Sequence, residues 1–282
     1  MDDHQIEKRI KDGIAERILG RIDTAYLAEV CKDEEFVVIA GNSLNKPRPH
    51  DIDVYKFVTE EEAKDNEEPV ERSVSVFGIG TGSFPNMTTK MPELDWCKGS
   101  GGPHRIVYES ANARTVKHDD DTYQYCAYRK PFHKLIESFD YAHVQVGAKL
   151  NLKTEKIDEV YFTDAYLNYL LTGKTCFTSS EYPLSSLLRA EKYKRYEVLS
   201  ASEFRECVLV ALGDVIQRGF DDYEDFKTQL QAVDLLLLEK NESNAAYRLY
   251  QICESRGLVK KPRHAKTIEE AEGVDNDDTE GD

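Results

Sequence analysis

The sequence predicts an α+β protein, in which a region of strands and helices is followed by an all-helical region. Short runs rich in β-branched and aromatic residues, separated by turns, occupy the chain before about residue 162. From about residue 164 onward, apolar residues recur with helical spacing and glycines follow the last apolar turns. Strands first and helices afterwards are typical of an α+β unit with an appended helical bundle.

The first region alternates predicted strands with two helical stretches. A long helix is predicted over residues 6–30, where Ile6, Ile10, Ile14 and Ile18 recur every four residues, and a short helix around 132–136. The predicted strands are residues 36–40, 52–57, 73–77, 123–128 and 141–146.

The second region carries clear helix boundaries. Gly173, Gly219 and Gly257 each follow the last apolar turn of a predicted helix, which is the usual place for a helix to stop. Ser200 followed three residues later by Glu203 is typical of a capping box. The predicted helices are residues 165–171, 184–196, 202–216, 226–238 and 245–253.

These patterns suggest four segments and two irregular connections. Residues 59–71 hold seven acids and a proline, and residues 78–103 are rich in glycine and proline, so both are expected to be exposed connections. The predicted segments are an N-terminal helical segment (1–33), an α/β domain (34–160), a helical domain (161–260) and an acidic, disordered tail (261–282).

Charge restricts the classes of function. The chain of 282 residues has 37 Lys and Arg against 53 Asp and Glu, a formal charge of −16. The last fourteen residues hold eight of these acids and no base, so half of the net charge lies in the tail. Nonspecific coating of DNA needs a surplus of basic residues and is therefore disfavoured, whereas a local basic groove is still compatible with the composition.

The remaining composition predicts a soluble cytoplasmic protein, in the host cytoplasm if a virus encodes it. No apolar run approaches the roughly 18 residues that a membrane helix needs, and the first residues are acidic, unlike a secretory leader. The six cysteines are scattered without a CxxC pair, which favours free thiols over disulfides or structural zinc.

The most informative stretch runs from residue 37 to residue 55. An apolar strand leads into the turn Gly41-Asn42-Ser43, and the next strand begins with Asp51 and Asp53. Residues two apart on a strand point to the same face, so these carboxylates should converge and bind a divalent metal, Mg²⁺ or Mn²⁺ in preference to zinc. The backbone amides of the turn and the Ser43 hydroxyl could hold a phosphate beside that metal, because Gly41 allows close approach.

This ordered set resembles the nucleotidyltransferase superfamily related to DNA polymerase β, whose signature is an apolar strand, a Gly-Gly or Gly-Ser turn and an Asp-x-Asp on the next strand. Asp140, expected to open a later strand, matches the third carboxylate of that superfamily. The turn departs from the signature, because Asn42 stands where a Gly or Ser is usual and Ser43 follows one place later. Residues 59–122 match no family pattern.

Over about residues 30–200 the chain looks most like a set of uncharacterised nucleotidyltransferase-like proteins encoded by phages and some bacteria. The stretches that carry this likeness are residues 110–113, 123–125, 139–143, 183–190 and 192–193.

The resemblance implies a small mixed-sheet nucleotidyltransferase core and a template-independent, two-metal transfer of a nucleoside monophosphate from a nucleoside triphosphate such as ATP. Asp51 and Asp53 would hold the ion that carries the triphosphate. Asp53 and Asp140 would hold the ion that activates the acceptor, with Asp140 as proton acceptor. Arg189 and Lys192, three apart on one helix, would bind triphosphate or sugar oxygens. An RNA end, a protein hydroxyl and a small molecule all fit as acceptor.

Two other functions compete with this reading. A catalytically inactive nucleotidyltransferase-fold module of a virus, used for binding or structure, would explain the altered turn and the acidic tail. A glycosyltransferase could use Asp51 and Asp53 for a nucleotide-sugar metal, but it does not need the Gly-x-Ser turn or Asp140.

Further polar and aromatic residues have simpler interpretations than a role in chemistry. Residues 118–121 could bind a metal, although a charged hairpin turn is favoured; His50 is expected in a turn, and His143 in the core. The tyrosines near and within the second region could stack a base, although helix packing is the simpler explanation; they are Tyr161, Tyr166, Tyr169, Tyr182 and Tyr193.

Overall fold

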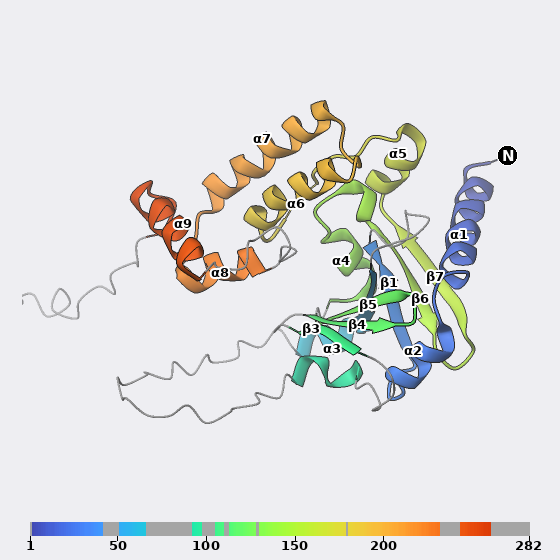
Figure 1. Ribbon diagram of the computed structural model, residues 1–282. Coiled ribbons are helices and arrows are strands. Elements are labelled where there is room, and N and C mark those ends of the chain that lie inside the picture. The colour runs from blue at the N-terminus through green and yellow to red at the C-terminus, as the bar shows by residue number, and fades with distance from the viewer. Residues whose placement is uncertain are drawn as a thin grey trace, which may run out of the picture.

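A mixed sheet with the strand order β3-β4-β5-β2-β1-β6-β7 organises the chain (Figure 1). The structure is a computed structural model, and it describes residues 2–41, 51–65, 92–97, 105–109, 113–127, 130–178, 180–231 and 243–260. Only β2 and β5 pair in parallel among these strands, and the other neighbours are antiparallel. The strands are β1 (Phe36–Ala40), β2 (Ile52–Lys56), β3 (Arg105–Glu109), β4 (Ala113–His118), β5 (Asp121–Cys126), β6 (Val146–Asn151) and β7 (Lys156–Phe162).

The predicted α+β organisation is confirmed, with a helical region after the sheet. Strand β1 lies inside the sheet, and four consecutive residues of it are almost fully buried because both faces are covered. Val37 and Ile39 pack with the N-terminal helices, whereas Val38 and Ala40 pack with α4 (Phe132–Glu137) on the other face. An apolar run of this kind is what a strand buried on both sides requires.

Two helices cover the first face where the sequence predicts one. They are α1 (Asp3–Leu19) and α2 (Thr24–Val30), and the prediction of a single helix over 6–30 is wrong. The helix breaks because Asp23 has an extended backbone and its carboxylate accepts the amide of Tyr26 at 2.9 Å, which starts a new helix. The amide of Asp23 donates to the Tyr123 hydroxyl at 2.9 Å, which fastens this corner to β5.

The segments expected to be irregular contain ordered elements. Helix α3 (Glu60–Asp65) lies in the first, and the 3₁₀ helix η2 (Pro92–Cys97) lies in the second. Leu94, Trp96 and Cys97 are buried in the core that the N-terminal helices share with the sheet. The second expectation of an exposed connection is therefore wrong for η2, and the predicted strand 73–77 lies outside the described residues.

The strand predicted over residues 141–146 is wrong, because the chain turns there before it enters β6. Tyr141 forms an isolated bridge with Phe177, and residues 142–144 form the 3₁₀ helix η3 (Ala142–Val144). Strand β6 then starts at Val146. The bridge diverts the backbone from the sheet, since the amide of Ala142 donates to the Cys176 carbonyl instead of to a strand partner.

Strands β3, β4 and β7 are not anticipated by the sequence patterns. The hairpin turn expected over residues 118–121 is present, since His118 ends β4, Asp121 begins β5 and Asp119 has a positive φ of 51°. The ring of His118 stacks on Tyr26 with centroids 3.8 Å apart, and its Nε2 lies 3.1 Å from the Asp23 carboxylate. His118 therefore joins this hairpin to α2.

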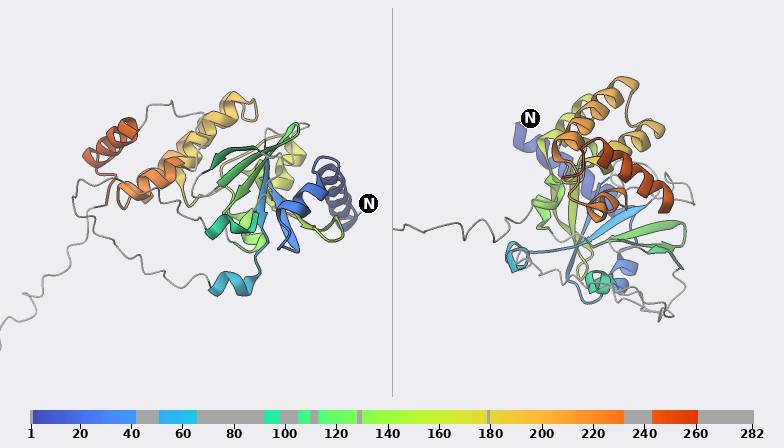
Figure 2. Two further views of the ribbon diagram at one scale, coloured as in Figure 1. Left: turned by 60° about the horizontal axis from the view of Figure 1, so that its bottom comes forward. Right: turned by 90° about the vertical axis from the view of Figure 1, so that its left-hand side faces the viewer.

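The second half forms a set of helices, most of which lie away from α1 and α2 (Figures 1 and 2). The first of them is the exception, since its Tyr166 is buried in the core that α1 and α2 share with the sheet. The predicted glycine stops are confirmed, with Gly173, Gly219 and Gly257 all at positive φ. The capping box between Ser200 and Glu203 is also confirmed. The helices are α5 (Asp164–Thr172), α6 (Pro183–Arg195), α7 (Ala201–Arg218), α8 (Tyr223–Gln231) and α9 (Ser243–Ser255).

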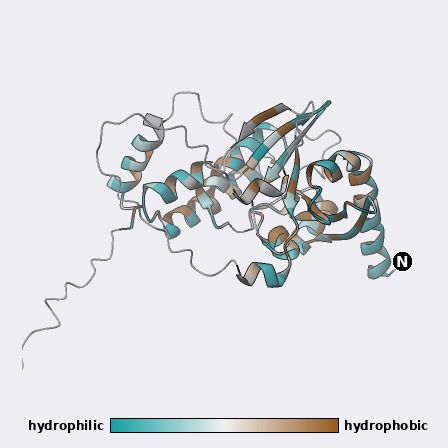
Figure 3. Ribbon diagram, turned by 90° about the horizontal axis from the view of Figure 1, so that it is seen from below, coloured by the Kyte–Doolittle hydropathy of each residue, from teal (hydrophilic) through white to brown (hydrophobic). Residues whose placement is uncertain are grey.

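Apolar contacts join these helices to one another and to the sheet. Tyr141 and Val144 at η3 pack with residues of α6 and α7, and a second cluster around Phe220 and Phe226 joins α6, α7, α8 and α9. Hydrophobic residues recur along the strands, whereas the free end of α1 is mostly hydrophilic (Figure 3). Within the described ranges, no helix is long and apolar enough to cross a membrane.

We predict that Gly219→Ala destabilises the protein by about 1–3 kcal/mol, because φ +63° with ψ −164° is a conformation that essentially only glycine adopts. A Cβ there would also lie 2.7 Å from the Leu258 carbonyl oxygen, which pairs with the Phe220 amide. Urea unfolding measures the change. The matched control is Gly213→Ala on the exposed side of α7, where a Cβ meets nothing within 4 Å and a gain of about 1 kcal/mol is expected. Equal effects of the two changes would contradict the prediction.

Candidate active site

Strands β1 and β2 place two carboxylates at one end of the sheet. Asp53 lies opposite Ala40 in the antiparallel register of the two strands. Ile52 and Val54 are buried toward the N-terminal helices, and Asp53, which alternates with them, is half-buried on the other side. The Asp53 carboxylate therefore leaves the sheet on the face that α4 covers. Asp51, directly before β2, is also half-buried, and its charge acts on Asp53.

Gly41 follows β1 directly and lies against one of these carboxylates. Its φ is +82°, and a Cβ added to it would be 3.4 Å from Oδ2 of Asp53. A side chain here would be strained and would crowd the carboxylate, so the glycine keeps the space beside Asp53 open. Asn42, Ser43 and His50 lie outside the described residues, and their predicted roles stay predictions.

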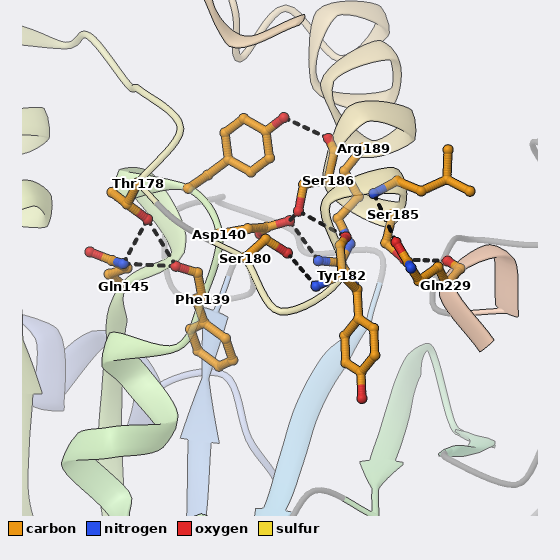
Figure 4. A network of polar contacts seen from close by, with 12 residues as sticks. Phe139, Asp140, Gln145, Thr178, Ser180, Tyr182, Ser185, Ser186, Arg189 and Gln229 are labelled. Carbon is orange, nitrogen blue, oxygen red and sulfur yellow. Dashed lines mark hydrogen bonds and ion pairs between the residues drawn. The ribbon is translucent and has the colours of Figure 1, made fainter. Parts of the chain in front are cut away.

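Asp140 lies between the sheet and helix α6. Its Oδ2 accepts hydrogen bonds from Ser186 Oγ and Arg189 Nη1, both at 2.7 Å (Figure 4). The Asp140 side chain is 5% exposed and the Arg189 side chain 32%. A buried carboxylate is stable when it is paired and hydrogen-bonded, and α6 supplies both kinds of contact from successive turns.

The loop that carries Asp140 is fixed by main-chain and side-chain contacts. The carbonyl of Phe139 accepts from Gln145 Nε2 at 2.7 Å and from Thr178 Oγ1 at 3.1 Å. The carbonyl of Asp140 accepts the Thr178 amide at 2.9 Å, and Gln145 Oε1 accepts the Thr163 hydroxyl at 2.7 Å. Since these polar groups satisfy one another, the backbone on either side of Asp140 is held in place.

Helix α6 is in turn positioned by a residue that the sequence analysis missed. Gln229 of α8 is fully buried, its Oε1 accepts the Leu184 amide at 3.1 Å, and its carbonyl accepts the Ser185 hydroxyl. The N-cap residue of α6, Tyr182, makes no side-chain cap bond, so Gln229 satisfies an amide of this helix start from another helix. No local sequence signal identifies such a partner, because it lies 45 residues away.

Electrostatic effects connect the carboxylates with residues of α6. Burial raises the pKa of Asp53 to about 8, and the charge of Asp51 adds to this, while Lys192 and Arg189 act in the opposite direction. Burial also raises the pKa of the Tyr193 hydroxyl, and the charges of Asp140, Asp53 and Asp51 raise it further. The charges of Arg189 and Lys192 on α6 therefore act on Asp53 of the sheet.

The donor set fits one divalent cation. Asp51 and Asp53 offer hard oxygen ligands, and a cation bound there would offset the burial and the Asp51 charge that raise the pKa of Asp53. Across the described ranges, no three or more His, Cys, Asp and Glu side chains are grouped so that they could hold a metal ion. Because Asp140 is paired with Arg189, its predicted part in a second metal site stays a prediction.

Other residues singled out in the sequence serve packing. His143 is buried as expected, with Nδ1 2.9 Å from Thr175 Oγ1 and its ring edge-on to Tyr193 at 4.4 Å. Tyr166 is buried against Phe162, and Tyr193 against Tyr141. The packing interpretation of these tyrosines is therefore confirmed for Tyr166 and Tyr193.

Comparison with known proteins identifies no family. No protein-family model matches the chain, and no curated protein matches it. Among solved structures, the Thermotoga maritima CCA-adding enzyme complexed with tRNA is similar, with a TM-score of 0.40 and 12% identity over 86% of this chain and 55% of that chain. A CCA-adding enzyme in complex with ATP has a TM-score of 0.40 and 13% identity over 84% of this chain and 54% of that chain.

This chain therefore spans about half the length of both enzymes. At such a TM-score and identity the similarity is too weak to support any statement about activity.

We predict that Asp53→Asn stabilises the protein, measured without divalent ions, by an amount that grows with pH. The folded pKa of Asp53 is raised from 3.8 to about 8, so the folded chain retains a proton that the unfolded chain loses over this window. The stability of the native protein therefore falls as pH rises from about 4 to about 8, and asparagine removes that dependence. Urea unfolding at several pH values tests this. If the free energies of unfolding of the native and Asp53→Asn proteins differ by the same amount from about pH 4 to about pH 8, the prediction is contradicted.

Proposed function

We propose that this chain transfers a nucleoside monophosphate from a nucleoside triphosphate to an acceptor hydroxyl. The proposal is supported by the position of Gly41 against the Asp53 carboxylate and by the charge of Asp51, which acts on Asp53. It is also supported by α6, whose Ser186 and Arg189 hold Asp140. Two carboxylates with a desolvated, raised-pKa member are typical of a site that binds a cation. The ordered motif that joins this glycine to the carboxylates supports the same function.

Different residues of the chain would have different roles in such a transfer. Asp51 and Asp53 would hold a divalent cation, which neutralises the triphosphate and leaves its α-phosphorus open to attack. Lys192 lies close enough to act on the charge of Asp53, and so is placed to bind phosphate oxygens that reach this cation. Gly41 leaves room for the phosphates to approach the backbone.

The reaction is a substitution at the α-phosphorus. The acceptor oxygen forms a bond to this phosphorus, the bond from it to the bridging oxygen breaks, and pyrophosphate leaves with the electron pair. We assign the acceptor proton to Asp140, through its Oδ1, because Ser186 and Arg189 both contact the other oxygen. An RNA end, a protein hydroxyl and a small molecule remain the acceptor classes to be tested.

One observation favours the alternative function, a non-catalytic binding or structural module. Arg189 balances the charge of Asp140 within the protein itself, so retention of this carboxylate does not require a substrate or a metal. In that case the site would be a structural ion pair beside two acids. The labelling experiment described next separates the catalytic function from the non-catalytic one.

We predict that the chain, with Mg²⁺ and an α-labelled nucleoside triphosphate, transfers label to an RNA, protein or small-molecule fraction of a cell extract. Asp51→Asn/Asp53→Asn should lower the transfer at least about 100-fold, because the triphosphate loses its charge partner. The matched control is Asp119→Asn/Asp120→Asn, which removes two exposed acids of the β4–β5 turn and should leave the transfer unchanged.

Two results would count against the proposal. Transfer that persists in the Asp51→Asn/Asp53→Asn protein would show that the assigned site is wrong. Absence of transfer by the native protein to all three fractions, with each of the four nucleoside triphosphates, would favour the non-catalytic module.

A further inference from the structure

We propose that Arg189 takes the place of a second metal ion, so that the chain binds a single divalent cation at Asp51 and Asp53, and none at Asp140. This inference rests on the proposed function, and it replaces the two-metal expectation drawn from the sequence resemblance. The feature that carries it is the ion pair between Arg189 and Asp140, which lies outside the motif on β1 and β2.

The first support is the contact itself. Arg189 Nη1 and Ser186 Oγ both lie 2.7 Å from the same oxygen of Asp140, whose side chain is 5% exposed. Separating a buried carboxylate from its partner leaves an uncompensated charge, and the cost of this is large. A metal ion that used Asp140 would have to displace the guanidinium or share the carboxylate with it at close range, where the two cations repel.

The second support is that both sides of the pair are held by other contacts. On the helix side, Tyr141 donates its hydroxyl to the Ser186 carbonyl at 2.7 Å, and Gln229 holds the two residues before Ser186. On the loop side, the Thr178 amide bonds the Asp140 carbonyl at 2.9 Å. The pair therefore joins two positioned backbones and is unlike a surface salt bridge between two mobile side chains.

The third support is the position of the charges. Arg189 contacts Asp140 at 2.7 Å, and its charge, like that of Lys192, acts on Asp53 of β2. A second metal ion shared by Asp53 and Asp140 would occupy this same region. No group of three or more metal-binding side chains forms there among the residues that the structure describes.

Counting bound Mn²⁺ by electron paramagnetic resonance, with a non-hydrolysable triphosphate analogue present, tests the inference. We expect one ion per chain in the native protein, and its loss in Asp51→Asn/Asp53→Asn. Arg189→Lys, which keeps a cation, should still bind one ion. Arg189→Gln should bind two, because Asp140 is then left without its positive partner. The matched control is Arg195→Gln on the exposed side of the same helix, which should bind one.

The outcomes separate this inference from the proposed function. Two ions per native chain would overturn the inference and leave the proposed function standing. In that case Arg189 would leave Asp140 when the triphosphate binds, and a second ion would bind there. One ion in the native protein that Asp140→Asn removes, but Asp51→Asn/Asp53→Asn does not, would also overturn it. One ion in a folded Arg189→Gln protein would show that Arg189 does not exclude the second metal. No bound ion in the native protein would overturn the proposed function itself.

Discussion

Negative charge at one end of the sheet is the constraint on which the rest of the arrangement depends. Asp53 lies on β2 with Asp51 directly before it, Asp140 lies in the loop after α4, and all three charges act on Tyr193. Partly desolvated carboxylates this close to one another destabilise a folded chain unless a cation balances them. Helix α6 supplies that balance from within the protein, with Arg189 on Asp140 and Lys192 near Asp53.

This constraint explains why the helical region is fastened to the sheet at one particular place. Gln229 fixes the first turn of α6, and that turn carries Ser186, which bonds Asp140. At the other end of α8, Arg218 and Asp225 form a bidentate salt bridge, in which Nη1 and Nη2 of Arg218 lie 2.9 and 3.0 Å from the two carboxylate oxygens. Polar contacts therefore fix both the α7–α8 corner and the first turn of α6, which bonds the carboxylate of the loop. In physical terms, the helices orient the cation that balances the site.

The parts of the fold that the sequence predicts well are those that local rules determine. The period of a strand is enough to place Asp53 on the face opposite Ile52 and Val54, because it needs no knowledge of the partner strands. The glycine stops and the Ser200–Glu203 capping box are likewise properties of a few neighbouring residues. For the same reason the type and approximate position of the C-terminal helices follow from their spacing.

The features that the sequence does not reveal depend on distant partners. Trp96 is buried in a segment that composition alone describes as a loop, because the core covers it from elsewhere in the chain. Residues 141–146 have a strand-like pattern, but the bridge from Tyr141 to Phe177 diverts the backbone. The pairing of Arg189 with Asp140 joins residues 49 apart, so each residue type is visible in the sequence whereas their contact is not.

A crystal structure with Mn²⁺ and a non-hydrolysable triphosphate analogue would test the central claim most directly, by locating each ion from its anomalous scattering. The account predicts one peak, between the carboxylates of Asp51 and Asp53, with Arg189 still in contact with Asp140. A second peak on Asp140, or no peak at Asp51 and Asp53, would contradict it.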